Sequence, residues 1–224
     1  MLILGHRGAS AERPENTLEA FARAYAVGAD GLEFDVRAAA DGIPVLAHDR
    51  DLQRRAGDPR NVDELPAATL ATIDVGDGHA VPTLREAMTL FAGRGFLDVE
   101  IKQAGIEAAI LTVLADYPEQ RWGISSFDWT VLSAVRAQHA TCDLWLLAVD
   151  SSPALFSTAA DLGAAGVALW AQAYTPKVAA SLRAAGLETI IWTVNDVAEA
   201  RRVRDLGAYA LCTDDPATLV AALR

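Results

Sequence analysis

The chain has 224 residues, of which 52% are hydrophobic and 22% charged, a composition typical of a folded globular protein. Its 19 Lys and Arg against 30 Asp and Glu give a net charge of −11, which argues against a nucleic-acid partner or an anionic membrane surface. No apolar stretch approaches the ~20 residues that cross a bilayer, and the run 1–4 is too short for an export signal. Because Cys142 and Cys212 form no CxxC or Cys/His pattern, we expect buried free thiols and a cytoplasmic location.

Eight short apolar runs, rich in β-branched residues, alternate with Ala- and Leu-rich segments of helical character. In chain order the expected strands are residues 2–4, 31–36, 96–101, 122–125, 144–149, 166–170, 189–194 and 209–213. A helix is expected after each of them.

The expected helices have recognisable starts and stops. Capping boxes or close analogues occur at residues 16–19, 83–86 and 196–199, and glycines such as Gly28 and Gly163 stand just before the next strand. Strand, helix and glycine repeated eight times predict an α/β fold, a closed parallel (β/α)8 TIM barrel. An open doubly wound sheet fits less well, since no GxGxxG follows the first strand.

One connection is irregular. Between the second strand and Thr83 lies a long stretch, residues 37–82, with one strand-like piece at 43–47 behind the turn signal Asp41-Gly42. We therefore expect a short hairpin and a long inserted loop, residues 50–81, within a single domain that covers residues 1–224. Long loops of this kind are usually functional or mobile.

Acidic residues gather where the barrel strands end. Glu33 and Asp35 stand two residues apart and so share one face of a strand, and Glu100 and Lys102 repeat this spacing on the next strand. Three carboxylates in a barrel mouth need a cation to stay ionised, and an all-oxygen set suits a hard ion such as Mg²⁺ or Ca²⁺. Ion pairing of these carboxylates with Arg7 and Lys102 alone is the structural alternative.

Two of the four histidines, His6 and His48, also lie at strand ends beside these carboxylates. Their position suggests an acid/base pair that titrates near neutral pH. Arg7 and Lys102 would supply positive charge for an anionic substrate, and Trp192 is placed to wall the pocket rather than fill the core. A metal, two cations and an acid/base pair fit hydrolysis of a phosphate ester.

The chain resembles the glycerophosphodiester phosphodiesterases. The resemblance follows the chain in order through His6-Arg7-Gly8, Pro14-Glu15-Asn16-Thr17, Gly28-Ala29-Asp30, Glu33-Phe34-Asp35-Val36, Asp41-Gly42, His48-Asp49, Glu100-Ile101-Lys102, Ser126-Phe127, Trp192-Thr193-Val194-Asn195 and Thr213-Asp214. The group from His6 to Asp49 is highly specific, whereas the later pieces are individually weak but correctly ordered.

The resemblance implies a (β/α)8 hydrolase of lipid and glycerol metabolism that cleaves glycerophosphodiesters to an alcohol and sn-glycerol 3-phosphate. It implies that one divalent cation, Mg²⁺, Ca²⁺ or Mn²⁺, is held by Glu33, Asp35 and Glu100. It also implies that His6 and His48 are the acid/base pair and that Arg7 and Lys102 hold the phosphate. In the family's mechanism a neighbouring glycerol hydroxyl attacks phosphorus, and water then opens the cyclic phosphate.

The expected partner is a small-molecule substrate, with no nucleic acid and no membrane. Phe127 and Trp192 are expected to wall the glycerol side. A phosphodiesterase acting on lysophospholipids and a catalytically silent binding barrel are the rival interpretations. The stretch 50–81 lacks the family's usual Arg-Thr-Thr-like signature and contains no aromatic residue, so we expect no strict selectivity for a choline ester.

Overall fold

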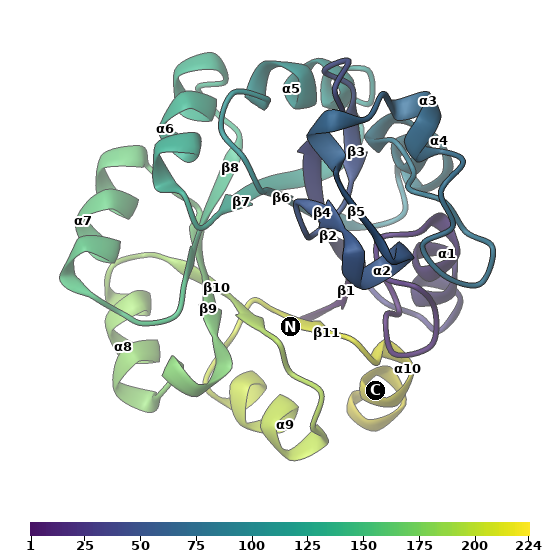
Figure 1. Cartoon of the computed structure of the whole chain (residues 1–224). Coiled ribbons are helices and arrows are strands. Elements are labelled where there is room, and N and C mark those ends of the chain that lie inside the picture. Colours follow the sequence, from purple (N-terminus) through teal and green to yellow (C-terminus); the bar gives the residue numbers. More distant parts are fainter.

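The computed structural model describes residues 1–224, and at its centre eight parallel strands close into a barrel (Figure 1). Strand β1 pairs with both β11 and β2, which closes the sheet. The predicted fold is confirmed, and the expected and observed strand bounds agree within two residues. The barrel strands are β1 (Leu2–His6), β2 (Gly31–Ala38), β6 (Phe96–Ile101), β7 (Arg121–Ser126), β8 (Asp143–Ala148), β9 (Gly166–Trp170), β10 (Glu188–Trp192) and β11 (Ala210–Thr213).

Helices form an outer ring around the barrel (Figure 1). A 3₁₀ turn, η2 (Ala171–Ala173), precedes α8. None of the helices has the length and apolar character of a membrane span. The ring consists of α1 (Leu18–Ala26), α4 (Leu84–Phe91), α5 (Glu107–Ala115), α6 (Trp129–Gln138), α7 (Pro153–Leu162), α8 (Pro176–Ala184), α9 (Val197–Asp205) and α10 (Pro216–Leu223).

The side-chain caps explain where several helices begin. Thr83 and Asp196 cap α4 and α9 as predicted, each accepting a hydrogen bond from the backbone three residues on. The capping box expected at residues 16–19 made Asn16 the cap of α1, and this prediction is wrong, because the cap is Thr17. Asn16 has a left-handed backbone (φ 58°), incompatible with the extended cap conformation, and its side chain bonds to Asp35 instead.

Apolar side chains form two layers, one between strands and helices and one inside the barrel. The inner layer is small and includes Trp145, which stacks on Tyr209 with ring centroids 5.6 Å apart. Gly123 and Gly166 make room for this indole, because a Cβ on either would lie 2.5 or 2.6 Å from a Trp145 ring atom. Apolar side chains thus fill the interior at the N-terminal ends of the strands, and polar side chains gather at the C-terminal ends, which form the mouth of the barrel.

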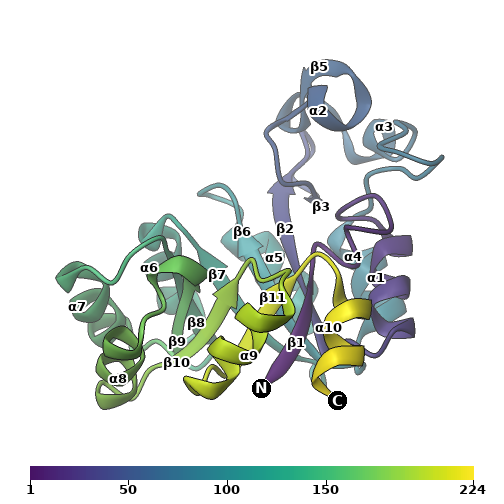
Figure 2. The same ribbon diagram turned by 90° about the horizontal axis from the view of Figure 1, so that it is seen from below.

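The stretch after β2 is more structured than the long loop expected for residues 50–81. It holds β3 (Pro44–Leu46), β4 (Asp51–Leu52), α2 (Gln53–Ala56), β5 (Asp58–Asn61), η1 (Val62–Glu64) and α3 (Ala67–Leu70). Strand β3 pairs antiparallel with the end of β2, which is the expected hairpin. The stretch 39–81, called the insert below, has its own cluster of nine buried apolar residues. Figure 2 shows it beyond the end of β2, at the opposite end of the barrel from the chain termini.

Candidate active site

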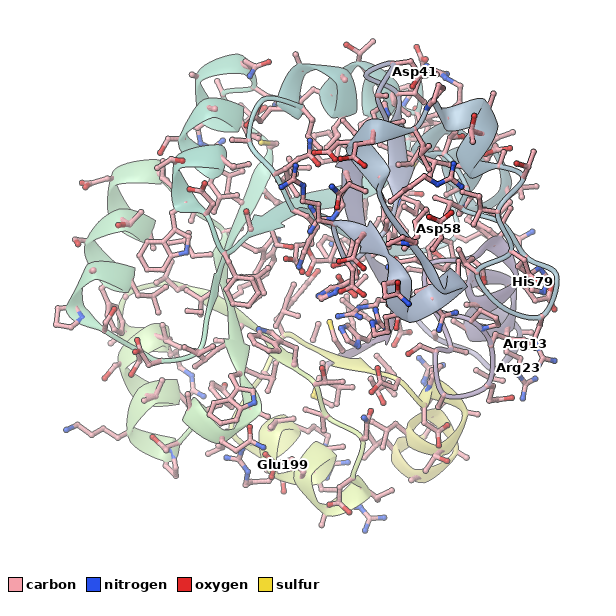
Figure 3. All side chains as sticks on the ribbon, in the orientation of Figure 1. Arg13, Arg23, Asp41, Asp58, His79 and Glu199 are labelled. Carbon is pink, nitrogen blue, oxygen red and sulfur yellow. The ribbon has the colours of Figure 1, made fainter.

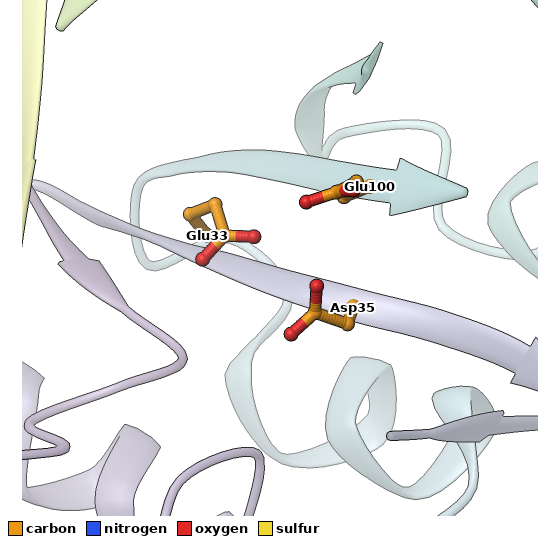
Figure 4. A group of neighbouring side chains, drawn as sticks. All are labelled: Glu33, Asp35 and Glu100. Carbon is orange, nitrogen blue, oxygen red and sulfur yellow. The ribbon is translucent and has the colours of Figure 1, made fainter. Parts of the chain in front are cut away.

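The three predicted metal-ligating carboxylates converge at the C-terminal mouth of the barrel. Glu33 and Asp35 share the inward face of β2, and Asp35 pairs in register with Glu100 of β6. One oxygen from each residue lies within 4.8 Å of the other two, and all three side chains are buried. Figure 4 shows the three side chains gathered between the two neighbouring strands.

Burial and mutual repulsion act strongly on this cluster. Burial, together with the charges of Asp35 and Glu100, raises the pKa of Glu33 well above its usual range. Burial and Asp35 likewise raise the pKa of Glu100 to about 8. The pKa of Asp35 is lowered even though burial opposes this, because the cations Arg7 and Lys102 lie beside it. In the protein alone, the three carboxylates therefore do not all ionise readily at neutral pH.

Arg7 and Lys102 are the two cations in contact with the cluster. Arg7 Nε lies 3.1 Å from Asp35 Oδ2 and its Nη1 lies 3.1 Å from Glu15 Oε1. Lys102 Nζ donates to Glu100 Oε1 at 2.6 Å and lies 3.5 Å from Asp35 Oδ1. The Arg7 backbone is left-handed (φ 55°), a conformation that costs a non-glycine residue about 1–2 kcal/mol. These contacts hold both cations at the mouth.

His6 is the last residue of β1 and is held by the end of the neighbouring strand β11. Its Nδ1 lies 2.6 Å from Oδ1 of Asp214, a carboxylate that also accepts from Ser10 (3.0 Å) and Asn195 (2.6 Å). Burial acts to raise the pKa of Asp214, but these hydrogen bonds lower it to about 2. Because ionised Asp214 can only accept, His6 carries a proton on Nδ1. Its Nε2 faces the cluster, 3.8 Å from Glu33 Oε2.

His48 follows β3 and is held by the insert. Its Nδ1 lies 2.8 Å from Asp49 Oδ1, and Arg54 bridges Asp49 (2.6 Å) to Glu15 (2.6 and 3.0 Å). The pKa of Asp49 is lowered, against the effect of burial, by hydrogen bonds from His48 and Arg54. Burial lowers the pKa of His48 more than the nearby carboxylates raise it. Arg37 donates twice to the His48 carbonyl oxygen, at 2.8 and 2.9 Å, and so fixes its backbone.

A cavity of about 280 Å³ brings the predicted residues together. Phe127 and Trp192 meet edge to face in its wall with ring centroids 5.5 Å apart, and Lys102 Nζ lies 5.9 Å from the centre of the Phe127 ring. The ninth predicted residue, Asp35, is fully buried in contact with Arg7 and Lys102. The other eight all line this one cavity: His6, Arg7, Glu33, His48, Glu100, Lys102, Phe127 and Trp192.

Several polar residues of the site carried no predicted role. Asp98 lies two residues before Glu100 on the same inward face of β6, so the alternation that found Glu100 could also have found it. Its side chain is buried, Oδ1 has no hydrogen-bond partner, and burial raises its pKa to about 7. Asp214 follows β11, and closure of the barrel brings it to His6, while Asn195, which follows β10, donates a hydrogen bond to Asp214. His79, by contrast, lies at the periphery of the molecule and does not line the cavity (Figure 3).

Comparison with known proteins decides the family. The family model described as "Glycerophosphoryl diester phosphodiesterase family" matches residues 6–218. The chain belongs to this family. It is thus a phosphoric diester hydrolase.

Individual relatives agree with the family match over the whole chain. A glycerophosphodiester phosphodiesterase from Caldanaerobacter subterraneus subsp. tengcongensis is 30% identical, covering 100% of this chain and 98% of its own. The crystal structure of a glycerophosphodiester phosphodiesterase from Thermotoga maritima is 29% identical with a TM-score of 0.86, covering 100% and 98%. A phosphodiesterase from Oleispira antarctica, solved with the product sn-glycerol-3-phosphate, is 26% identical with a TM-score of 0.93, covering 100% and 96%.

Proposed function

We propose that this family member hydrolyses glycerophosphodiesters to an alcohol and sn-glycerol 3-phosphate, with one divalent cation and with His6 and His48 as proton-transfer groups. The observation that carries the proposal is the convergence of three buried carboxylates within one cavity that also holds two histidines and two cations. The Oleispira relative, solved with sn-glycerol-3-phosphate, supports the choice of product.

The donor set fits a hard divalent cation. Glu33, Asp35 and Glu100 offer only oxygen atoms, and Asp35 Oδ1 is buried without a hydrogen-bond partner. Burial and repulsion disfavour ionisation of Glu33 and Glu100, and a bound cation would reverse this. When bound, Mg²⁺, Ca²⁺ or Mn²⁺ would supply Lewis-acid stabilisation of the negative charge that develops on the phosphoryl oxygens.

Arg7 and Lys102 are proposed to hold the phosphate. Their charged groups lie on the cavity wall beside the carboxylates, and both side chains are mostly buried. Carboxylate contacts orient each cation before substrate arrives, so little reorganisation is needed on binding. Phe127 and Trp192 form an apolar corner suited to the carbon skeleton of the glycerol.

The histidines are proposed to move protons in two successive steps. Each carries a proton on Nδ1, held by an aspartate, so each has Nε2 available for proton transfer. In the first step one histidine accepts the proton of the attacking glycerol hydroxyl, while the other protonates the departing alcohol. In the second step the roles reverse, as water opens the cyclic phosphate.

The proposed product, sn-glycerol 3-phosphate, supports a role in lipid and glycerol metabolism, and the cysteines support a cytoplasmic location. Cys142 and Cys212 are both buried and free of disulfides, as is usual in a reducing compartment. The family match from residue 6 to 218 supports one domain over the whole chain.

The test is release of sn-glycerol 3-phosphate from glycerophosphodiesters in the presence and absence of a chelator. We expect activity to disappear with excess chelator and to return with Mg²⁺, Ca²⁺ or Mn²⁺. Full activity in excess chelator would remove the metal from the proposal, and release of product only from lysophospholipid vesicles would replace the substrate class.

A further inference from the structure

A second hollow opens beside the active-site cavity, between the barrel mouth and the insert. It measures about 500 Å³ and shares His48 and Lys102 with the active-site cavity. Every residue that lines it is polar or charged, and four of them are the cations Arg37, Arg50, Arg54 and Lys102. The lining also includes Asp49 and Asp51, so positive side chains outnumber negative ones there, whereas the chain as a whole has a net charge of −11.

Three of these four cations are paired with carboxylates. Lys102 contacts Glu100 and Asp35, Arg54 contacts Asp49 and Glu15, and Arg50 lies 3.1 Å from Asp63. Arg37 has no carboxylate within 4.0 Å. Its two hydrogen bonds go to a neutral group, the His48 carbonyl oxygen, and use Nε and Nη2. Nη1 forms no hydrogen bond, and the guanidinium interacts with carboxylates such as Asp35 and Asp49 only at longer range, without a direct ion pair.

The position of Arg37 follows from the strand that carries it. Glu33, Asp35 and Arg37 alternate along β2 and so share one face, with Arg37 one step beyond the carboxylates towards the insert. The double hydrogen bond to His48 fixes the planar guanidinium in the wall of the hollow. The charge is thus fixed in place.

The geometry points to this hollow as the subsite for the leaving alcohol, with Arg37 selecting alcohols that carry a negative charge. This inference rests on the proposed function. Phosphate held by Arg7 and Lys102 would have its glycerol arm on the side of Phe127 and Trp192. The second ester arm must diverge from phosphorus, and the space next to Lys102 and His48 on the other side is this hollow.

Charge complementarity then sets the order of preference. An anionic alcohol gains attraction from the unpaired guanidinium, a neutral polyol gains hydrogen bonds, and an ammonium alcohol is repelled. No Phe, Tyr or Trp lines the hollow, so it lacks the electron-rich ring faces that bind a quaternary ammonium group. The structure thus sharpens the sequence-based expectation that the choline ester is not strictly preferred.

The experiment compares kcat/KM for three glycerophosphodiesters: glycerophosphocholine, glycerophosphoglycerol and glycerophosphoinositol 4-phosphate. Their leaving alcohols are cationic, neutral and anionic. We expect the wild type to prefer the inositol phosphate ester over the choline ester, and R37Q to narrow this ratio about tenfold. R37K retains the charge but not the forked hydrogen bond to His48, so it should lower activity on all three while keeping most of the ratio.

The matched control is R60Q. Arg60 is an exposed residue of the same insert, is paired with Asp58 (labelled in Figure 3) and does not line the hollow, so its loss should change neither activity nor ratio. An equal loss on all three substrates in R37Q would overturn the inference and leave Arg37 as a positioning residue for His48. A wild-type preference for the choline ester would also overturn it. Absence of hydrolysis of all three would overturn the proposed function itself, and this inference with it.

Discussion

The two histidines of the active site face one cavity but are supported by different parts of the molecule. His6 belongs to the barrel, at the end of β1, and its aspartate follows β11, the strand paired with β1. His48 belongs to the insert, between β3 and β4, and its aspartate is the next residue in the chain. One support is built by closure of the barrel, and the other by a local turn.

The partners behind the two aspartates differ in kind. Asp214 accepts from Ser10 and Asn195, which are neutral. Asp49 is held by Arg54, which is also paired with Glu15, so this support is a row of alternating charges. Neutral hydrogen bonds are insensitive to salt, whereas exposed ion pairs are screened by it. The orientation of His6 thus depends on hydrogen bonds that should be insensitive to ionic strength, whereas the orientation of His48 depends on ion pairs that salt should weaken.

The largest expected effect is loss of either imidazole. His6→Ala and His48→Ala should each lower kcat by roughly 10²–10⁴, because each step needs one proton acceptor and one donor. Circular dichroism should show that both variants stay folded, since neither ring belongs to an apolar cluster. If one variant kept near wild-type kcat, only the other histidine would take part in the chemistry.

The next effect separates the two supports. Asp214→Asn should lower kcat by roughly 10², and Asp49→Asn by about tenfold. The His6 side chain is 18% exposed and depends on its carboxylate for orientation, whereas that of His48 is 33% exposed, so that water can replace part of the support. Steady-state kinetics at one fixed metal concentration measures kcat for both variants. Equal losses would show that the barrel and the insert support their histidines equally.

A smaller effect tests the chemical difference behind the aspartates. Arg54→Gln and Ser10→Ala should each lower kcat about two- to fivefold at low salt, since each removes one donor to an aspartate. At high salt the gap between Arg54→Gln and wild type should narrow, because salt already weakens the half-exposed ion pairs of Arg54. The gap for Ser10→Ala should not change. Parallel salt curves for both variants would contradict the proposed difference.

The sequence predicted the barrel and the carboxylate cluster because both follow from short-range regularities. Alternation along a strand places Glu33 and Asp35 on one face, and caps and glycines mark the helix ends. Asp98 obeys the same alternation, so its place beside the cluster could also have been predicted from the sequence. The role of Asn16 could not, because its hydrogen bond to Asp35 depends on a left-handed backbone that is set by how the chain enters α1.

The supports of the histidines could not be predicted in the same way. Asp214 lies 208 residues from His6, and only closure of the barrel makes them neighbours. Within the insert, nine apolar residues are spread over positions 39–81 without helical or strand periodicity, so their common cluster is not visible in the sequence. Because this cluster positions α2, the link from Arg54 to Asp49 and Glu15 appears only in the structure.

The pH dependence gives the finest test of the comparison. Burial lowers the pKa of His48 below its ordinary value of 6.5, and the Asp49 carboxylate partly opposes this by stabilising the imidazolium. Removing that negative charge in Asp49→Asn favours the neutral ring, so the pKa of His48 should fall further. One limb of the profile of kcat/KM against pH should therefore move to lower pH in Asp49→Asn. It is the acid limb if His48 accepts the first proton, and the alkaline limb if His48 donates it.

Asp214→Asn should leave that limb in place, because Asp214 contacts His6 and not His48. A shift to higher pH in Asp49→Asn would contradict the proposed effect of the Asp49 charge on His48. If the same limb moved in both variants, the two histidines would titrate as one coupled unit and would not be separately controlled by barrel and insert.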